Sequence, residues 1–274
     1  MTKKIFALLL AMCLVLSVAA CSAPSSTDTG TPNNTPSEQT SPTNESNNQQ
    51  SSDVSNAGQS SGSAEKTEKL DSLEAFESIV MKDVEDYITS MTKEMEALAI
   101  EIDSFEKYKE NEDRIQGFYD MVCNETLRLE ICLMEHAVAY TEFVMESESD
   151  FEDKYDDLDE LYDIVYEDAG DEIYDEVYDG ILDDMYDLFY DGLLDEAYDS
   201  VPYEKWFDAC SNEYERWLDT CSECYEIWLD ARSDLYEFWV DMRSATFGKD
   251  AEEAYETISK FKEDIEELKA DLQK

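Results

Sequence analysis

The sequence predicts an all-α protein, an elongated antiparallel helical bundle or coiled coil of about five helices. Three observations support this fold class. After residue 65, apolar residues recur at spacings of three and four, which is the helical period. No proline interrupts residues 65–201, and no alternating strand pattern persists there. Two internal repeats, of 11 and 12 residues, fill much of the C-terminal half.

The first 64 residues are not expected to join the bundle. Residues 1–20 have a basic start followed by an apolar run too short to span a bilayer comfortably, as in a signal peptide. Residues 22–64 are mostly Ser, Thr, Asn, Gln, Pro and Gly, and they cannot bury enough apolar surface to offset the entropy of ordering. We therefore predict a signal peptide at 1–20, a disordered tether at 21–64, and an acidic helical bundle at 65–274.

The junction between signal and tether reads Val18-Ala19-Ala20-Cys21. It closely resembles the lipobox of bacterial lipoprotein signals, which is Leu or Val, two small residues and Cys. The resemblance implies that Cys21 becomes the diacylated N-terminus and inserts in the lipid bilayer. Two acyl chains anchor a protein stably, whereas one does not. This places the protein on the extracytoplasmic face of the membrane, at the cell surface. An ordinary cleaved signal and an uncleaved anchor are the alternatives. By analogy, the long polar tether is typical of Gram-positive surface lipoproteins.

Residues 68–108 and 112–147 are predicted to form the first two helices of the bundle. In each, the apolar residues follow a single stripe that faces neighbouring helices. The first stripe consists of Leu70, Leu73, Phe76, Val80, Val84, Tyr87, Met91, Met95, Leu98, Ile102 and Phe105. The second consists of Ile115, Phe118, Val122, Thr126, Leu129, Leu133, His136, Tyr140 and Phe143.

Terminal signals delimit three further helices. Ser149-Asp150-Phe151-Glu152 matches a capping box and predicts the start of the third. Pro202 is tolerated only in a first turn, so we expect a break near Ser200 and a fourth helix over 202–246. Gly248 and a second capping box at 250–253 predict a stop and then a fifth helix over 250–273.

The fourth helix contains four copies of an 11-residue unit. Eleven residues turn an α-helix only about 20° beyond three full turns, so equivalent positions stay on one face. We interpret the aromatic stripe as a packing interface between helices, because a sugar-binding platform needs only two or three exposed rings. Its columns are Tyr203, Tyr214, Tyr225 and Tyr236; Trp206, Trp217, Trp228 and Trp239; Phe207, Leu218, Leu229 and Val240; and Cys210, Cys221, Arg232 and Arg243.

The third helix carries a 12-residue repeat, seen in residues 178–189 and 190–201. Its apolar pairs recur every four residues, and four residues advance about 40° beyond one α-helical turn. The stripe is therefore expected to circle the helix. Contact with different neighbours at different heights is the favoured explanation. A bend at Gly170, Gly180 or Gly192 and wrapping by a second molecule are the alternatives.

The charge limits the choice of partners. The chain has 69 acidic and 20 basic residues and a formal net charge of −49. Nucleic acid and anionic membrane surfaces are excluded, because binding them requires Lys and Arg. Divalent cations, cationic peptides and basic proteins fit this charge. The sequence leaves the oligomeric state open.

Four residues are candidates for a metal site. Cys132 and His136 are one turn apart on the second helix, and Cys221 and Cys224 are one turn apart on the fourth. If those helices pack suitably, three thiols and one imidazole complete a tetrahedral Zn²⁺ site. Buried inert thiols, disulfides and redox chemistry are the alternatives, and the thiols outside the signal and Cys21 are odd in number.

No catalytic motif is found. One histidine leaves little room for a Ser-His-Asp arrangement, and no glycine-rich phosphate loop is present. Asp156-Asp157-x-Asp159 and Asp183-Asp184 offer loose Ca²⁺ ligands, but no EF-hand loop surrounds them. We therefore expect a non-enzymatic surface lipoprotein that serves as an interaction or spacer module. The alternative is a lipoprotein that binds divalent cations or a cationic ligand.

Overall fold

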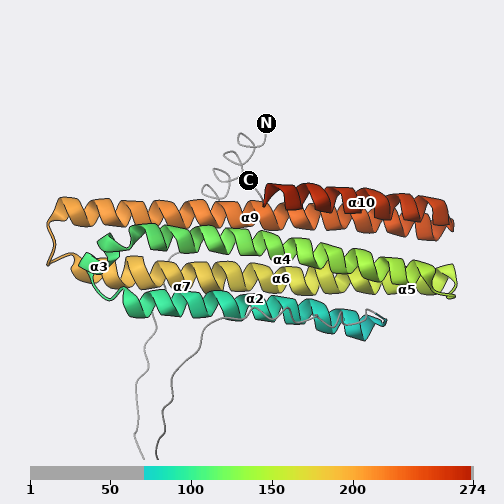
Figure 1. The fold of residues 1–274 in the computed structure, drawn as a ribbon, viewed down its shortest axis with the longest axis horizontal. Coiled ribbons are helices and arrows are strands. Elements are labelled where there is room, and N and C mark those ends of the chain that lie inside the picture. Colours follow the sequence, from blue (N-terminus) through green and yellow to red (C-terminus); the bar gives the residue numbers. More distant parts are fainter. Residues whose placement is uncertain (1–70, 273–274) are drawn as a thin grey trace, which may run out of the picture. The chain divides into compact units, whose positions relative to one another are not determined.

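The computed structural model describes residues 71–272, and within this range it contains helices and turns but no strand. Figure 1 shows the long helices lying side by side along one axis. Short connections make consecutive helices antiparallel, so the predicted all-α bundle is confirmed. The helices are α2 (Leu73–Glu101), α3 (Phe105–Glu110), α4 (Glu112–Glu146), a composite helix (residues 151–197), α9 (Tyr203–Gly248) and α10 (Ala251–Asp271).

One hydrophobic core extends along the bundle. α4 packs against α2, α9 and α10, and the composite helix packs against α2, α4 and α9. The stripe predicted for the first helix faces this core, because residues three and four apart share one helix face. Its buried members in α2 are Phe76, Val80, Val84, Tyr87, Met91, Met95 and Leu98.

The prediction of one unbroken helix over 68–108 is wrong. α2 ends at Glu101, and α3 starts at Phe105. Ile102 leaves the helical conformation with φ −106° and ψ 81°, and the Ser104 hydroxyl accepts a hydrogen bond from the Lys107 N–H. A serine side chain that caps a new helix competes with continued helical bonding. The apolar spacing continues across the break and conceals it.

The other helix ends lie close to the predicted positions. Asp150, and not Ser149, caps the third helix: its carboxylate accepts from the N–H groups of Glu152 and Asp153. Asp250 caps α10 in the same way through the Glu253 N–H. α9 ends at Gly248, but the left-handed residue is Lys249, with φ 58°.

The composite helix alternates α-helical and π-helical turns. Its α-helical parts are α5 (Phe151–Tyr162), α6 (Ala169–Asp175), α7 (Asp183–Tyr186) and α8 (Asp195–Ala197), and the π-helical segments are Asp163–Asp168, Glu176–Leu182 and Asp187–Leu194. A π turn bonds i to i+5 and encloses one residue more than an α turn. Three turns of about 3.6 residues plus one extra residue make roughly 12, which matches the sequence repeat.

The expectation that the apolar stripe circles this helix is therefore wrong. It assumed a purely α-helical period. With π segments the mean period rises toward four residues per turn, so residues four apart remain on the same face. Eight consecutive positions at this interval are all buried: Leu161, Val165, Ala169, Ile173, Val177, Ile181, Met185 and Phe189.

The two repeats match each other across the interface between the composite helix and α9. Each 12-residue unit of one meets an 11-residue unit of the other, because both span about three turns. Tyrosines 12 residues apart therefore meet tryptophans 11 residues apart in reverse order. The ring centroid distances are 4.3 Å for Tyr162–Trp239, 5.2 Å for Tyr174–Trp228, 4.8 Å for Tyr186–Trp217 and 4.8 Å for Tyr198–Trp206.

Side chains of α9 satisfy carbonyls at or near the π segments. The change from i+5 to i+4 bonding leaves acceptors without an N–H partner inside the helix, and buried carbonyls require one. The Trp206 indole donates to the Leu194 carbonyl at 2.8 Å, and the Trp228 indole donates to Gly170 at 2.9 Å. Arg232 donates to the Val165 carbonyl. These bonds hold α9 in register with the composite helix.

Candidate functional site

The structure brings two of the four predicted metal ligands together. Cys132 and His136 of α4 face Asp83 of α2. The His136 Nε2 atom lies 2.8 Å from Asp83 Oδ2, and Cys132 Sγ lies 3.5 Å from His136 Nε2 and 3.4 Å from Asp83 Oδ2. We call these three residues the Asp-Cys-His cluster. Their side chains are partly exposed, which leaves the cluster accessible to ions from solvent.

The other two predicted ligands, Cys221 and Cys224 on α9, lie outside this cluster, so the four residues do not form the predicted tetrahedral site. Cys224 Sγ lies 3.4 Å from Cys123 Sγ inside the bundle. The hydrogen bond between Cys224 and Cys123, together with burial, raises the pKa of the Cys224 thiol, and burial raises the pKa of the Cys221 thiol to about 12. Both groups are therefore protonated at neutral pH and unreactive as nucleophiles.

Sequence reasoning missed Asp83. It lies 49 residues before Cys132 and is one of many acidic residues of α2. Only the pairing of α2 with α4 distinguishes Asp83 from its neighbours. The signal available in the sequence was its place beside the buried Val84, at the edge of the apolar stripe.

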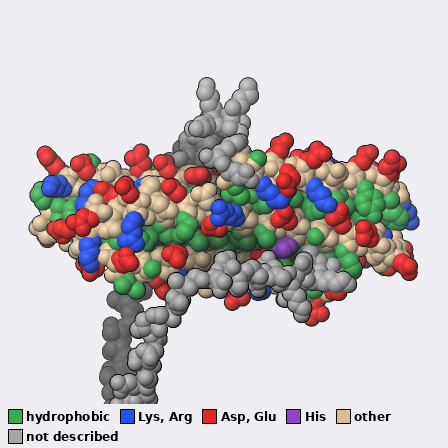
Figure 2. Space-filling model, in the orientation of Figure 1, with side chains coloured by type: hydrophobic (Ala, Val, Ile, Leu, Met, Phe, Trp, Pro, Cys, Tyr) green, Lys and Arg blue, Asp and Glu red, His purple; other side chains and the backbone are tan. Residues whose placement is uncertain are grey.

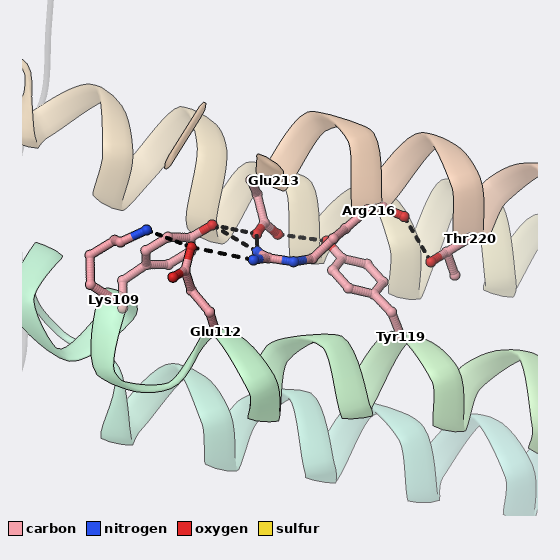
Figure 3. A network of polar contacts seen from close by, with 7 residues as sticks. Lys109, Glu112, Tyr119, Glu213, Arg216 and Thr220 are labelled. Carbon is pink, nitrogen blue, oxygen red and sulfur yellow. Dashed lines mark hydrogen bonds and ion pairs between the residues drawn. The ribbon is translucent and has the colours of Figure 1, made fainter. Parts of the chain in front are cut away.

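A second polar cluster lies between α3, α4 and α9, and Figure 3 shows its members converging on Glu213. This fully buried carboxylate accepts hydrogen bonds from Tyr108 at 2.7 Å, from Tyr119 at 2.9 Å and from Arg216 at 2.8 Å. Burial and the Glu213 charge raise the pKa of both tyrosines. Both oxygens of the carboxylate accept from protein donors, so we assign this cluster a structural role.

The aromatic stripe of α9 is only partly a packing interface. The core-facing columns are smaller or polar side chains: Ala209, Thr220, Ala231 and Met242, and Glu213, Cys224, Leu235 and Thr246. The tryptophans lie half-buried against the composite helix. The prediction that the rings are consumed in packing is therefore wrong for the exposed Tyr203, Tyr214 and Tyr236 and for the Phe/Leu/Val column beside them. It holds for Tyr225, which is half-buried with its ring centroid 6.3 Å from that of Tyr178.

These exposed residues form what we call the α9 stripe, which runs the full length of the helix. They recur at spacings of four, seven or eleven residues, so they share one face. Their relative exposures range from 38% at Val240 to 82% at Phe247. The other members are Tyr203, Phe207, Tyr214, Leu218, Leu229 and Tyr236.

Acidic residues cover much of the remaining surface. Figure 2 shows carboxylates along both long edges of the bundle, with apolar side chains between them on this face. On α9, exposed acids repeat with the 11-residue unit directly beside the α9 stripe. They are Glu204, Glu215, Glu226 and Glu237, and Asp208, Asp219, Asp230 and Asp241.

The larger hollows in the described part of the chain are open to solvent. The largest, about 470 Å³, lies where the turn at 102–106 meets residues 188–201 of the composite helix and its end. An open hollow buries little of a small ligand, whereas small-molecule sites enclose most of it. This geometry favours recognition on an outer face of the bundle.

Comparisons with protein-family models, with curated proteins and with solved structures find no match to this chain. Within residues 71–272, no helix combines the length and the apolar character needed to cross a bilayer. The predicted signal peptide, Cys21 and the tether lie outside the described residues.

Proposed function

We propose that this chain is a lipid-anchored protein of the bacterial cell surface that presents its acidic helical bundle as a non-enzymatic interaction module. The observation that carries the interaction role is the α9 stripe. A row of exposed apolar side chains on one face of a strongly charged protein is typical of a partner-binding surface. The anchoring role is supported by the residues Val18-Ala19-Ala20-Cys21.

The chemistry of this surface selects a cationic amphipathic helix as the partner. Apolar side chains at helical spacing accept the apolar face of another helix laid along them. The exposed acids beside the α9 stripe, such as Asp219 and Asp230, then face the partner's Lys and Arg residues. The same charge repels a second copy of this acidic chain, which carries a formal net charge of −49.

Anchoring is tested at Cys21. When the full chain is produced in a Gram-positive bacterium with radiolabelled palmitate, we expect a labelled, membrane-bound protein. Cys21→Ser removes the thiol that accepts the lipid, so the label disappears and the protein leaves the membrane fraction. Cys13→Ser, inside the apolar run of the signal, is the matched control and keeps both properties. A labelled, membrane-bound C21S variant would contradict the proposal.

The interaction role is tested with a synthetic Lys/Leu amphipathic helix as the probe. We expect it to bind the full chain in low salt, and L218N/L229N to weaken binding about 10-fold or more, because each lost apolar contact at the centre of an interface costs about 1 kcal/mol or more. Both side chains are exposed, at 39% and 43%, so the bundle should still fold. Fluorescence anisotropy measures the affinity, and circular dichroism checks the fold.

Two controls distinguish binding at the α9 stripe from non-specific hydrophobic binding of the peptide. Ile100→Asn removes an apolar side chain that is 79% exposed on α2, and it should leave the affinity unchanged. A peptide with Glu in place of Lys should bind weakly if the acids contribute. Equal binding of both peptides, or equal loss in I100N and in L218N/L229N, would remove the support for an interaction module on α9.

A further inference from the structure

We propose that the Asp-Cys-His cluster, formed by Asp83, Cys132 and His136, is a Zn²⁺ site that joins α2 to α4. This site is independent of the α9 stripe and of membrane anchoring. It takes a carboxylate oxygen, a thiolate sulfur and an imidazole nitrogen from two helices.

The donor atoms already have nearly the separations that a zinc ion imposes. Zn–O and Zn–N bonds are about 2.0–2.2 Å and Zn–S bonds about 2.3 Å, so tetrahedral ligands lie roughly 3.3–3.6 Å apart. The two separations that involve Cys132 Sγ are 3.4 and 3.5 Å. The separation between Asp83 Oδ2 and His136 Nε2 is 2.8 Å, the distance of a direct hydrogen bond. This pair must open by about half an ångström when the ion binds.

Helix geometry fixes two of the three donors. Cys132 and His136 are four residues apart on α4, so they lie on the same face one turn apart. Asp83 comes from the facing side of α2, beside the buried Val84. Because both helices are held by the core, the donors converge without rearrangement of the backbone.

The donor set favours Zn²⁺ over the hard cations that an acidic surface also attracts. Sulfur and imidazole nitrogen are preferred by zinc, whereas Mg²⁺ and Ca²⁺ prefer oxygen ligands. The Cys132 thiol loses its proton to solvent as the Zn–S bond forms. The proton of the Asp83–His136 hydrogen bond also leaves, to solvent or to His136 Nδ1, so that the neutral imidazole donates its Nε2 lone pair to the ion. With three protein ligands and a partly exposed position, a water molecule completes the tetrahedron.

Zinc titration of the full chain tests the site. The protein is kept reduced, in about 0.15 M salt with an excess of Mg²⁺, so that loose binding to surface acids is suppressed. We expect one Zn²⁺ per chain, competed by a chelating dye of known affinity, and a higher melting temperature with Zn²⁺ than with Mg²⁺ alone. Co²⁺ in place of Zn²⁺ should give a sulfur-to-cobalt charge-transfer band.

Matched variants assign the ligands. Cys132→Ser, His136→Asn and Asp83→Asn should each weaken Zn²⁺ binding by more than about 100-fold, the upper range for loss of a supporting group. C132S should also abolish the charge-transfer band. Cys221→Ser removes a thiol outside the cluster, and Asp86→Asn removes an exposed carboxylate of α2. Both controls should bind Zn²⁺ like the original protein. Absence of Zn²⁺ binding over Mg²⁺, a band that survives in C132S, or equal weakening in C221S would each overturn the proposal.

Discussion

Replacing Arg232 by methionine is expected to destabilise the bundle by about 3–5 kcal/mol, because it leaves Glu130 as an unpaired buried carboxylate. The two side chains are 2% and 1% exposed and form an ion pair between α9 and α4. Arg232 also donates to the Val165 carbonyl in the first π segment. Urea denaturation monitored by circular dichroism measures the loss of unfolding free energy.

Gly170 makes room for the Arg232 guanidinium. A Cβ atom at Gly170 of α6 would lie 2.5 Å from the Arg232 Nη1 atom, so any larger residue there would displace the guanidinium. The guanidinium cannot move aside without giving up both Glu130 and Val165. The loss of unfolding free energy in R232M therefore measures the loss of the contacts that Arg232 makes with Glu130 and Val165.

The pH dependence gives the R232M prediction a second readout. Burial raises the pKa of Glu130 above its ordinary 4.5, and the Arg232 charge opposes this increase. Without Arg232 the folded protein holds the Glu130 proton to higher pH than the unfolded chain does. The folded state then binds more protons, so stability falls as the pH rises above about 4.5. We expect the deficit of R232M to be smaller at pH 5 than at pH 7.

Arg243→Met is the matched control for R232M. Arg243 occupies the same column one 11-residue unit later, but its side chain is 43% exposed and its ion pair with Asp159 spans 3.8 Å. Exposed pairs contribute about 0–1 kcal/mol. The double variant E130M/R232M should recover most of the stability lost in R232M, because no buried charge remains. Similar losses in R232M and R243M, or no recovery in the double variant, would contradict the prediction.

Local signals in the sequence were sufficient for the fold class and for most helix ends. The apolar spacing of α2 and α4, Pro202 before α9 and Asp250 before α10 each act within one or two turns of helix. Such signals are independent of what packs against the helix. The break at Ile102 was missed, because the stripe continues through it and only the capping of α3 reveals it.

The π segments could have been inferred from the period but not located. An apolar period of four is too long for an α-helix, and extra residues in the turns are a physical solution. Which turns widen depends on donors from another helix, such as Trp206 and Trp228 of α9. The same limit applies to the candidate metal site. Cys132 and His136 share a local pattern, whereas Asp83 joins them only through the packing of α2 on α4.

The second large effect is expected at Glu213, where leucine should destabilise the bundle by about 3–5 kcal/mol. The change removes the acceptor for Tyr108, Tyr119 and Arg216 and leaves two buried hydroxyl groups without an acceptor. The Arg216 guanidinium then keeps only Glu112, at 3.4 Å, and the Tyr108 hydroxyl. Size alone does not account for this effect, because Leu235 fills the same repeat column two units later and is buried. Thermal and urea unfolding measure the loss.

Two further variants at this cluster distinguish lost hydrogen bonds from lost packing. Glu213→Gln keeps the shape and one acceptor, so it should cost about 1–3 kcal/mol, less than E213L. Adding Tyr108→Phe and Tyr119→Phe to E213L removes the orphaned hydroxyls and should restore part of the stability. Glu215→Leu, two residues away and exposed, should change stability by less than about 0.5 kcal/mol. If the triple variant is no more stable than E213L, the buried carboxylate acts through packing, and the hydrogen bonds in Figure 3 do not hold α3, α4 and α9 together.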